Sequence, residues 1–129
     1  MGARDSVTIE ALAEQAGAAR AFAGGMLGAA HPCLDVAVLL VSELVTNSVR
    51  HSGPAAAGGQ VTVTVSAADR GARAEVAERS GPGVPALLPD AGGGAEGGRG
   101  MRPVDALSDR WSYERGSGQA VTWFELHCA

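Results

Sequence analysis

Three polar side chains, Glu43, Asn47 and His51, follow one another at steps of four inside an otherwise apolar stretch. In a helix, residues four apart lie on one face, so a carboxylate, an amide and an imidazole form a polar stripe there. The remaining circumference is apolar and predicts packing on a core, through Leu39, Leu40, Leu44, Val45 and Val49. A buried polar group without a partner costs roughly 1–3 kcal/mol. The stripe therefore indicates either a ligand or metal site or a solvated helix face.

A glycine-rich turn, Gly97-Gly98-Arg99-Gly100, stands directly before Met101, where a helical pattern begins. Such a turn presents backbone N–H groups and the positive end of the helix dipole to an anion. The turn alone also fits a plain flexible loop. Neither the spacing of a Walker P-loop nor a dinucleotide-binding fingerprint after a strand is present.

The chain has 129 residues, the length of one domain, and we expect residues 1–129 to form a single unit. No uninterrupted apolar stretch has the length of a membrane span, which predicts a cytoplasmic protein that does not use a membrane. The net charge of −4 argues against direct nucleic-acid binding, because such proteins usually carry a basic surface. Cys33 and Cys128 are far apart in the sequence, and we expect free thiols.

Hydrophobic periodicity predicts three helices and two hairpins. The helices are expected at Thr8–Ala29, Leu34–His51 and Met101–Arg110, and the strands at Gln60–Ser66, Ala72–Glu78, Trp111–Arg115 and Ala120–His127. Between them, Arg79–Gly98 has no period and many glycines, and a loop of that length usually has a function. This order predicts an α+β fold of two layers, a mostly antiparallel sheet covered on one face by three helices.

The combination of motifs resembles a known superfamily. Ser42-Glu43-Leu44-Val45-Thr46-Asn47, a hairpin that ends at an acid, the Gly97–Gly100 turn and Ser108-Asp109-Arg110-Trp111 are similar to the Bergerat-fold (GHKL) ATPases. These include gyrase, heat-shock ATPases and histidine kinases. Within them, the chain looks most like the small bacterial anti-sigma factor serine kinases. The likeness covers about Arg20 to Leu126, and its most specific part is Asp35–His51.

The resemblance implies ATP and Mg²⁺ as ligands and assigns roles at the helical stripe. Asn47 matches the magnesium ligand, and Glu43 matches the general base that polarises the attacking nucleophile. Both roles suit the chemistry of the groups, since an amide oxygen is a hard neutral ligand and a carboxylate accepts a proton. Arg50 and His51 match a commonly basic position that can face phosphate, while His51 also fits a residue that balances the helix dipole.

The resemblance also places the nucleotide's two ends. Glu78 stands where the family has the aspartate that reads the adenine amino group, and its extra methylene displaces the carboxylate by about one bond length, which matters for hydrogen bonds near 3 Å. Ser80 occupies a usual glycine position, and Pro103 stands where a good helix former is usual. The other nucleotide contacts implied are Gly81, Gly83, Gly98, Arg99, Gly100 and Met101.

Two functions from different classes remain open at this point. The first is an ATP-dependent protein serine kinase that regulates transcription by phosphorylating an anti-anti-sigma factor and sequestering a sigma factor. The second is a binding module of the same fold with little or no nucleotide turnover, which the altered acid Glu78 favours. A detached histidine-kinase catalytic domain is disfavoured, since no dimerisation helix with a phosphoacceptor histidine is visible. Homodimerisation follows from the resemblance only.

Overall fold

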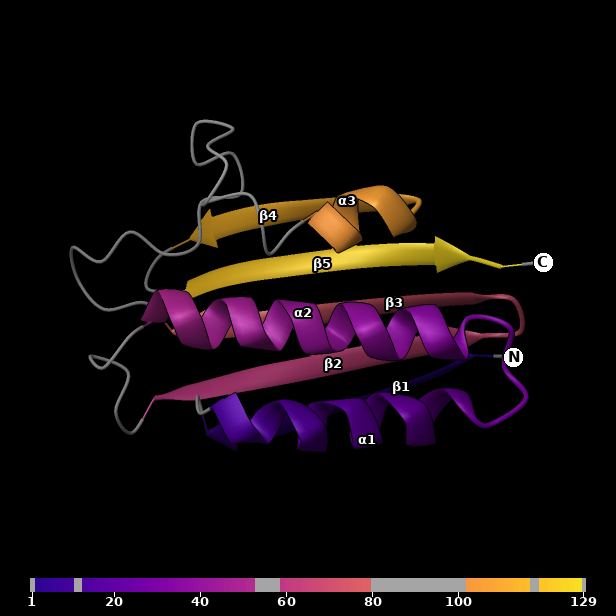
Figure 1. Cartoon of the computed structure of the whole chain (residues 1–129), viewed down its shortest axis with the longest axis horizontal. Coiled ribbons are helices and arrows are strands. Elements are labelled where there is room, and N and C mark those ends of the chain that lie inside the picture. The colour runs from indigo at the N-terminus through magenta and orange to yellow at the C-terminus, as the bar shows by residue number, and fades with distance from the viewer. Residues whose placement is uncertain (1, 11–12, 53–58, 80–101, 117–118, 129) are drawn as a thin grey trace.

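The computed structural model describes residues 2–10, 13–52, 59–79, 102–116 and 119–128. In this part of the chain, five strands form one sheet in the order β1-β2-β3-β5-β4, and every neighbouring pair is antiparallel. The strands are β1 (Ala3–Glu10), β2 (Gln60–Ala68), β3 (Gly71–Arg79), β4 (Arg110–Gly116) and β5 (Gln119–His127). Figure 1 shows them running lengthwise, with α2 lying along the strands in front of the middle of the sheet.

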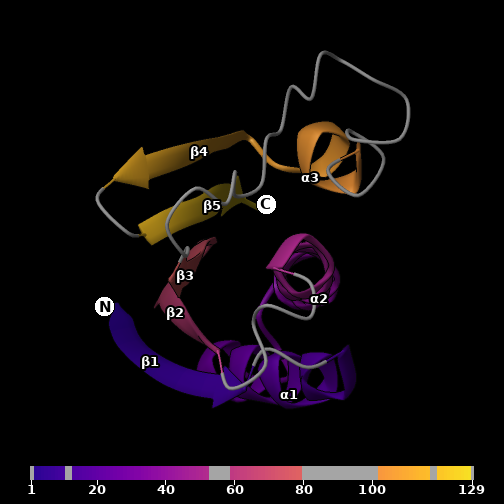
Figure 2. The ribbon, with the colours of Figure 1, turned by 90° about the vertical axis from the view of Figure 1, so that its left-hand side faces the viewer.

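The helices lie on one face of this sheet, and β1 at its edge bends toward α1 (Figure 2). They are the 3-10 turn η1 (Ala13–Gln15), α1 (Ala16–Leu27), α2 (Leu34–Ser52) and α3 (Arg102–Leu107). The prediction of a two-layer α+β fold with a mostly antiparallel sheet and three α-helices on one face is therefore confirmed. None of the helices in the ranges described has the length and apolar character needed to cross a membrane.

The core forms between α1, α2 and the helix-facing side of the sheet. Alternation along β2 buries Val61, Val63 and Val65, as expected for a strand with one solvated face. From the other layer, Leu40 and Leu44 of α2 are fully buried against it. The buried residues of the helices and of the strands thus form one hydrophobic cluster. Its further members include Ala19, Ala23, Val41, Val45, Ala74, Val76, Val104 and Phe124.

The N-terminal prediction is wrong in one respect. A helix was expected from Thr8, but β1 runs to Glu10, and the helical part begins only after it, with η1 and α1. Cross-strand pairing explains the difference, because the hydroxyls of Ser6 and Thr8 lie 2.7 and 3.0 Å from those of Thr64 and Thr62 on β2. Hydroxyl pairs of this kind stabilise neighbouring strands. Ile9, expected on a helix, contributes to the core from β1 instead.

The third helix is shorter than the predicted range Met101–Arg110, because α3 ends at Leu107. Asp109 then joins the sheet, its backbone N–H donating to the carbonyl of Glu125 at 2.9 Å. Arg110, predicted as the last helical residue, is the first residue of β4. The indole N–H of Trp111 donates to Asp105 at 3.0 Å and ties this strand to α3.

The expectation of free thiols is also wrong. Cys33, directly before α2, and Cys128, directly after β5, form a disulfide across 95 residues of sequence. Their Cα atoms are 5.5 Å apart, a usual separation for bridged cysteines. Two cysteines so distant in the chain give no pairing signal, and only the packing of α2 on the sheet brings them together.

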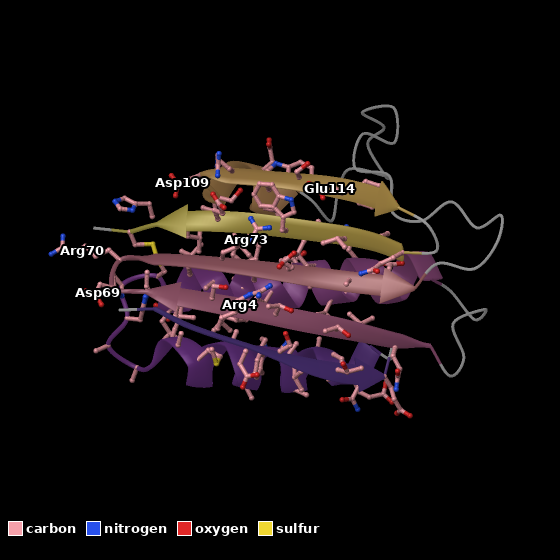
Figure 3. All side chains as sticks on the ribbon, turned by 180° about the vertical axis from the view of Figure 1, so that it is seen from behind. Arg4, Asp69, Arg70, Arg73, Asp109 and Glu114 are labelled. Carbon is pink, nitrogen blue, oxygen red and sulfur yellow. A yellow bond between two sulfur atoms is a disulfide. The ribbon has the colours of Figure 1, made fainter. Side chains whose placement is uncertain are left out.

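The outer face of the sheet, turned away from the helices, is polar (Figure 3). Glu125 of β5 accepts hydrogen bonds from Arg110 at 2.6 Å and from Arg73 at 3.0 Å. The Arg110 hydrogen bond, followed by that of Arg73, holds the pKa of Glu125 below its usual value, against the opposing effect of burial. Arg73 also lies over the ring of Trp123, 4.3 Å from its centroid.

A matched pair of substitutions on neighbouring strands tests which face is buried. Val76 on β3 faces the helices and is buried, whereas Val121 on β5 faces outward and is half-buried. We expect Val76→Ala to lower the free energy of unfolding by about 1–3 kcal/mol, because it deletes buried methyl groups and leaves a cavity. Val121→Ala should cost roughly half of that or less in the same urea titration. Equal losses would mean that the two faces are assigned wrongly.

Candidate functional site

The helix α2 carries the polar stripe, and the structure separates its members by burial. Asn47 is only 2% exposed, and both polar atoms of its side chain are shielded from solvent. It lies three residues after Leu44 and seven after Leu40, on the face that packs on the sheet. Glu43, one turn earlier, is half-buried at the edge of this face. A solvated helix face therefore does not describe Asn47.

Glu78 lies at the end of β3, where the sequence placed it. The strand alternates so that Ala72, Ala74 and Val76 face the helices, and Glu78 is the next residue in that series. Its side chain is 5% exposed. A buried carboxylate is costly unless it is hydrogen-bonded, and the neighbouring helix supplies the bond.

The hydroxyl of Ser48 donates to Oε1 of Glu78 at 2.5 Å. Ser48 is 1% exposed and follows Asn47 directly in α2. This contact joins the second half of α2 to the end of β3, two segments 30 residues apart in the chain. The structure thus brings Asn47 and Glu78 to one end of the molecule, where α2 and β3 both terminate (Figure 1).

Sequence reasoning missed two polar residues near this end. Ser48 lies four residues after Leu44 and three after Val45, so its helical phase already indicated a buried position. Thr122 on β5 is also buried; it lies opposite Val76 on the helix-facing side, among Ala120 and Phe124. A threonine at an inward position of an alternating strand is the signal that could have identified it.

Several predicted contacts lie outside what the structure describes. The helix α2 extends through Arg50 and His51, but the side chains of these two residues are not described. The residues Ser80, Gly81, Gly83, Gly98, Arg99, Gly100 and Met101 fall in the segment 80–101, outside the described ranges. The described part of the site is therefore one wall, built by α2 and β3, with α3 beginning at Arg102 beside it.

The chemistry of this wall fits a nucleotide. A carboxylate at Glu78 accepts hydrogen bonds from an amino group such as that of adenine. The amide oxygen of Asn47 is a hard, neutral ligand of the type that Mg²⁺ takes when it also binds phosphate oxygens. Glu43 is half-buried rather than enclosed.

Comparison with known families decides what kind of domain this is. A family profile described as "Histidine kinase-like ATPase domain" matches residues 9–126. The chain belongs to this family. Membership in an ATPase family implies nucleotide binding in general, and it confirms the predicted superfamily.

A solved structure shows the same fold as this histidine kinase-like ATPase domain. It is "The crystal structure of the RsbU and RsbW domains of Rv1364c from Mycobacterium tuberculosis", with 22% sequence identity and a TM-score of 0.70. The match covers 98% of this chain and 32% of that chain, so this chain spans about a third of its length. No curated protein matches the sequence.

The Ser48 contact can be tested by a serine-to-alanine pair on one helix. Ser48→Ala removes the donor to the buried carboxylate of Glu78, and a hydrogen bond to a charged group contributes about 1.5–3 kcal/mol. We expect that loss in the free energy of unfolding. Ser42→Ala is the control, because the Ser42 hydroxyl accepts from Arg20 at 3.0 Å in an exposed setting, and it should change stability by at most about 0.5 kcal/mol. Similar losses of stability in both variants would show that the buried hydrogen bond to Glu78 contributes no more than the exposed hydrogen bond between Ser42 and Arg20.

Proposed function

We propose that this domain binds MgATP against the wall formed by α2 and β3 and acts as an anti-sigma type regulator. In this proposal it transfers the γ-phosphoryl group of ATP to a serine of an anti-anti-sigma factor and, in the other state of the system, holds a sigma factor. The observation that carries the proposal is the convergence of Asn47, Ser48 and Glu78, all buried, at one end of an ATPase-family domain.

At the phosphate end, Asn47 holds the metal through its amide oxygen. Bound Mg²⁺ neutralises charge on the phosphates and fixes their orientation. Glu43 lies one helical turn earlier and is half-buried, so its carboxylate is placed to accept the proton of an incoming serine hydroxyl. Arg50 and His51 continue α2 beyond Asn47, and the resemblance assigns this basic position to the phosphates.

At the base end, Glu78 accepts the adenine amino group. Its side chain is longer than the aspartate that the resemblance leads one to expect, and Ser48 fixes one carboxylate oxygen at 2.5 Å. A fixed carboxylate loses less conformational freedom on binding a ligand. The glycines Gly81 and Gly83, and then Gly98, Arg99, Gly100 and Met101, complete the nucleotide contacts by resemblance.

The remaining parts of the proposal follow from the resemblance and the family. The domain spans residues 1–129, works in the cytoplasm and forms a homodimer, with no direct contact to nucleic acid or membrane. The similarity to a structure that contains an RsbW domain supports the placement among partner-switching regulators. A non-catalytic module is the second candidate, and Glu78 in place of the expected aspartate favours it, because the longer side chain displaces the carboxylate that would contact adenine.

MgATP binding is tested first by thermal unfolding. Ligand at a hundred times its dissociation constant should stabilise the domain by about 2.7 kcal/mol, which raises the melting temperature by several degrees. Asn47→Ala should abolish the part of the shift that depends on Mg²⁺ and retain the part produced by ATP with a chelator. No shift for the wild type at millimolar MgATP would select the nucleotide-free module.

The base role of Glu43 is tested by transfer of labelled phosphate from ATP to a serine-containing anti-anti-sigma protein. Glu43→Gln should lower the transfer rate by roughly 10²–10⁴-fold and leave MgATP affinity nearly unchanged, because only proton transfer is lost. Glu14→Gln, the same change at an exposed residue of η1, is the control and should match the wild type. Equal rates in Glu43→Gln and Glu14→Gln would remove the general-base role.

A further inference from the structure

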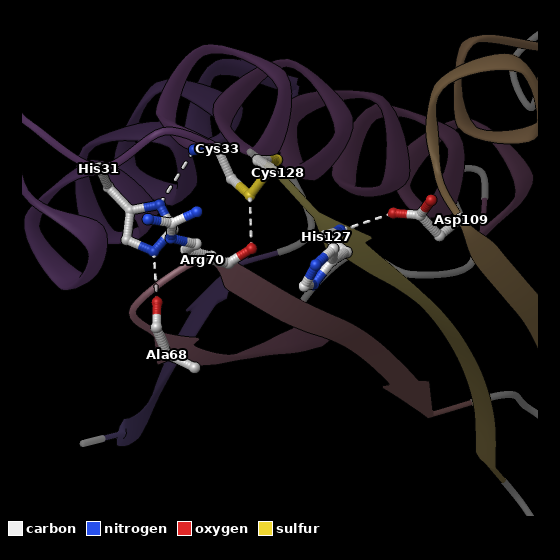
Figure 4. The surroundings of a disulfide bond; sticks show 7 residues. All are labelled: His31, Cys33, Ala68, Arg70, Asp109, His127 and Cys128. Carbon is white, nitrogen blue, oxygen red and sulfur yellow. Dashed lines mark hydrogen bonds between the residues drawn. A yellow bond between two sulfur atoms is a disulfide. The ribbon is translucent and has the colours of Figure 1, made fainter.

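Four segments that are remote in the chain meet at the end of the fold opposite the candidate site (Figures 1 and 4). They are the connection before α2, the turn between β2 and β3, the connection between α3 and β4, and the last residue of β5 with the residue that follows it. We call this cluster the clasp and define it as His31, Cys33, Arg70, Asp109, His127 and Cys128. Its centre is the Cys33–Cys128 disulfide.

Cys33 is held in place by hydrogen bonds that do not involve sulfur. Its backbone N–H donates to Nδ1 of His31 at 3.0 Å, and its carbonyl accepts from Ala37 at 2.8 Å in the first turn of α2. The other ring nitrogen of His31, Nε2, lies 2.6 Å from the carbonyl of Ala68, which can only accept. His31 therefore carries its proton on Nε2 and joins the start of α2 to the end of β2.

Cys128 is held in the same manner on the other side. Its backbone N–H donates to the carbonyl of Arg70 at 2.7 Å. One residue earlier, the backbone N–H of His127 donates to Oδ2 of Asp109 at 2.5 Å. Both cysteine backbones thus have hydrogen-bond partners that do not depend on the bond between the sulfur atoms.

The two cysteines differ in exposure. As whole residues, Cys33 is 0% exposed, whereas Cys128 is half-buried. We therefore expect an incoming thiolate to attack Cys128, with Cys33 as the leaving group. Cys33 stands at the start of α2, where the helix dipole stabilises negative charge on a departing thiolate. Once protonated, the Cys33 thiol has an acceptor nearby, because its sulfur lies 3.8 Å from the carbonyl oxygen of Arg70.

We propose that Cys33 and Cys128 form a reversible thiol–disulfide exchange site that low-molecular-weight thiols open and close without unfolding the domain. A small thiolate attacks Sγ of Cys128, forms a mixed disulfide with it and releases the Cys33 thiolate. A second small thiolate then attacks the added sulfur, which yields the small-molecule disulfide and the Cys128 thiolate. Both protein thiolates take protons from water, and the two electrons come from the two small thiols.

The asymmetry of access is tested with two single variants incubated with oxidised glutathione. Cys33→Ser leaves only Cys128, and Cys128→Ser leaves only Cys33. We expect Cys128 to form the mixed disulfide at least about tenfold faster than Cys33, as followed by mass spectrometry, because reactivity follows exposure. Equal rates, or a faster reaction at Cys33, would contradict the proposed direction of attack.

Reversibility is tested on the whole chain with reduced and oxidised glutathione. Native protein treated with reduced glutathione should gain two alkylatable thiols, keep its far-ultraviolet circular dichroism and melt several degrees lower, since a 95-residue loop is no longer closed. Reoxidation should be first-order, at a rate independent of protein concentration. Reduction that requires denaturant, loss of the helical signal, or disulfide-linked dimers on reoxidation would each overturn the proposal.

The contribution of the backbone anchors is tested by a pair of aspartate variants. Asp109→Ala removes the acceptor for the backbone N–H of His127. The equilibrium with glutathione should then shift toward the reduced form by at least about threefold. A shift of this size corresponds to part of the free energy that a hydrogen bond to a carboxylate contributes. Asp5→Ala is the control, because Asp5 also accepts a backbone N–H, that of Ser6 at 2.8 Å, but on the edge strand β1. An equal shift in both variants would show that Asp109 does not hold the sulfur atoms together.

Discussion

The packing of α2 on β3 is the constraint on which the rest of the structure depends. The apolar face of α2 can be buried only with Leu40, Leu44 and their neighbours against the sheet. That choice fixes the rotation of the helix about its axis, and hence the direction of every polar side chain on it. Asn47 and Ser48 are buried as a consequence, and Ser48 meets the carboxylate of Glu78. The positions of Asn47 and Ser48 therefore follow from the packing of the core, because no local feature of the helix alone would fix them.

Hydrophobic periodicity in the sequence was sufficient to predict those helices and strands that carry many buried residues. In α2 and β2 the apolar positions recur with clear helical and alternating periods, and both elements lie close to where they were expected. By contrast, β1 is an edge strand in which only Ile9 is fully buried. Its identity is set by pairing with β2, whose partner residues lie 50 to 64 positions later in the chain. A pattern read along the sequence contains no information on such a partner.

The residues of the candidate site also fall into those that could be predicted from the sequence and those that could not. Glu43 and Asn47 could be selected from helical spacing, and Glu78 from the resemblance to the Bergerat-fold ATPases. The helical phase of Ser48 indicated a buried position, but its contact could not be predicted, since the partner Glu78 lies 30 positions later. The disulfide is the extreme case, because 95 residues separate its cysteines and only the packing of α2 on the sheet brings them within bonding distance. What could be predicted was local in the chain, and what could not was created by contacts between distant segments.

The two ends of α2 are connected by a rigid element. Asn47 lies thirteen residues after Leu34, a separation of about 20 Å along a helix. The helix begins at the clasp and carries the proposed nucleotide wall near its other end, with its length packed on α1 and β3. Loosening of its first turn therefore need not displace Asn47, whose position is set by the core around Leu44 and by the contact of Ser48 with Glu78. Coupling between the ends requires that α2 shift as a whole, and the close-packed cluster beneath it resists such a shift. The clasp is accordingly a device that acts first on the stability of the fold, and on ligand binding only through the fraction of molecules that remain folded.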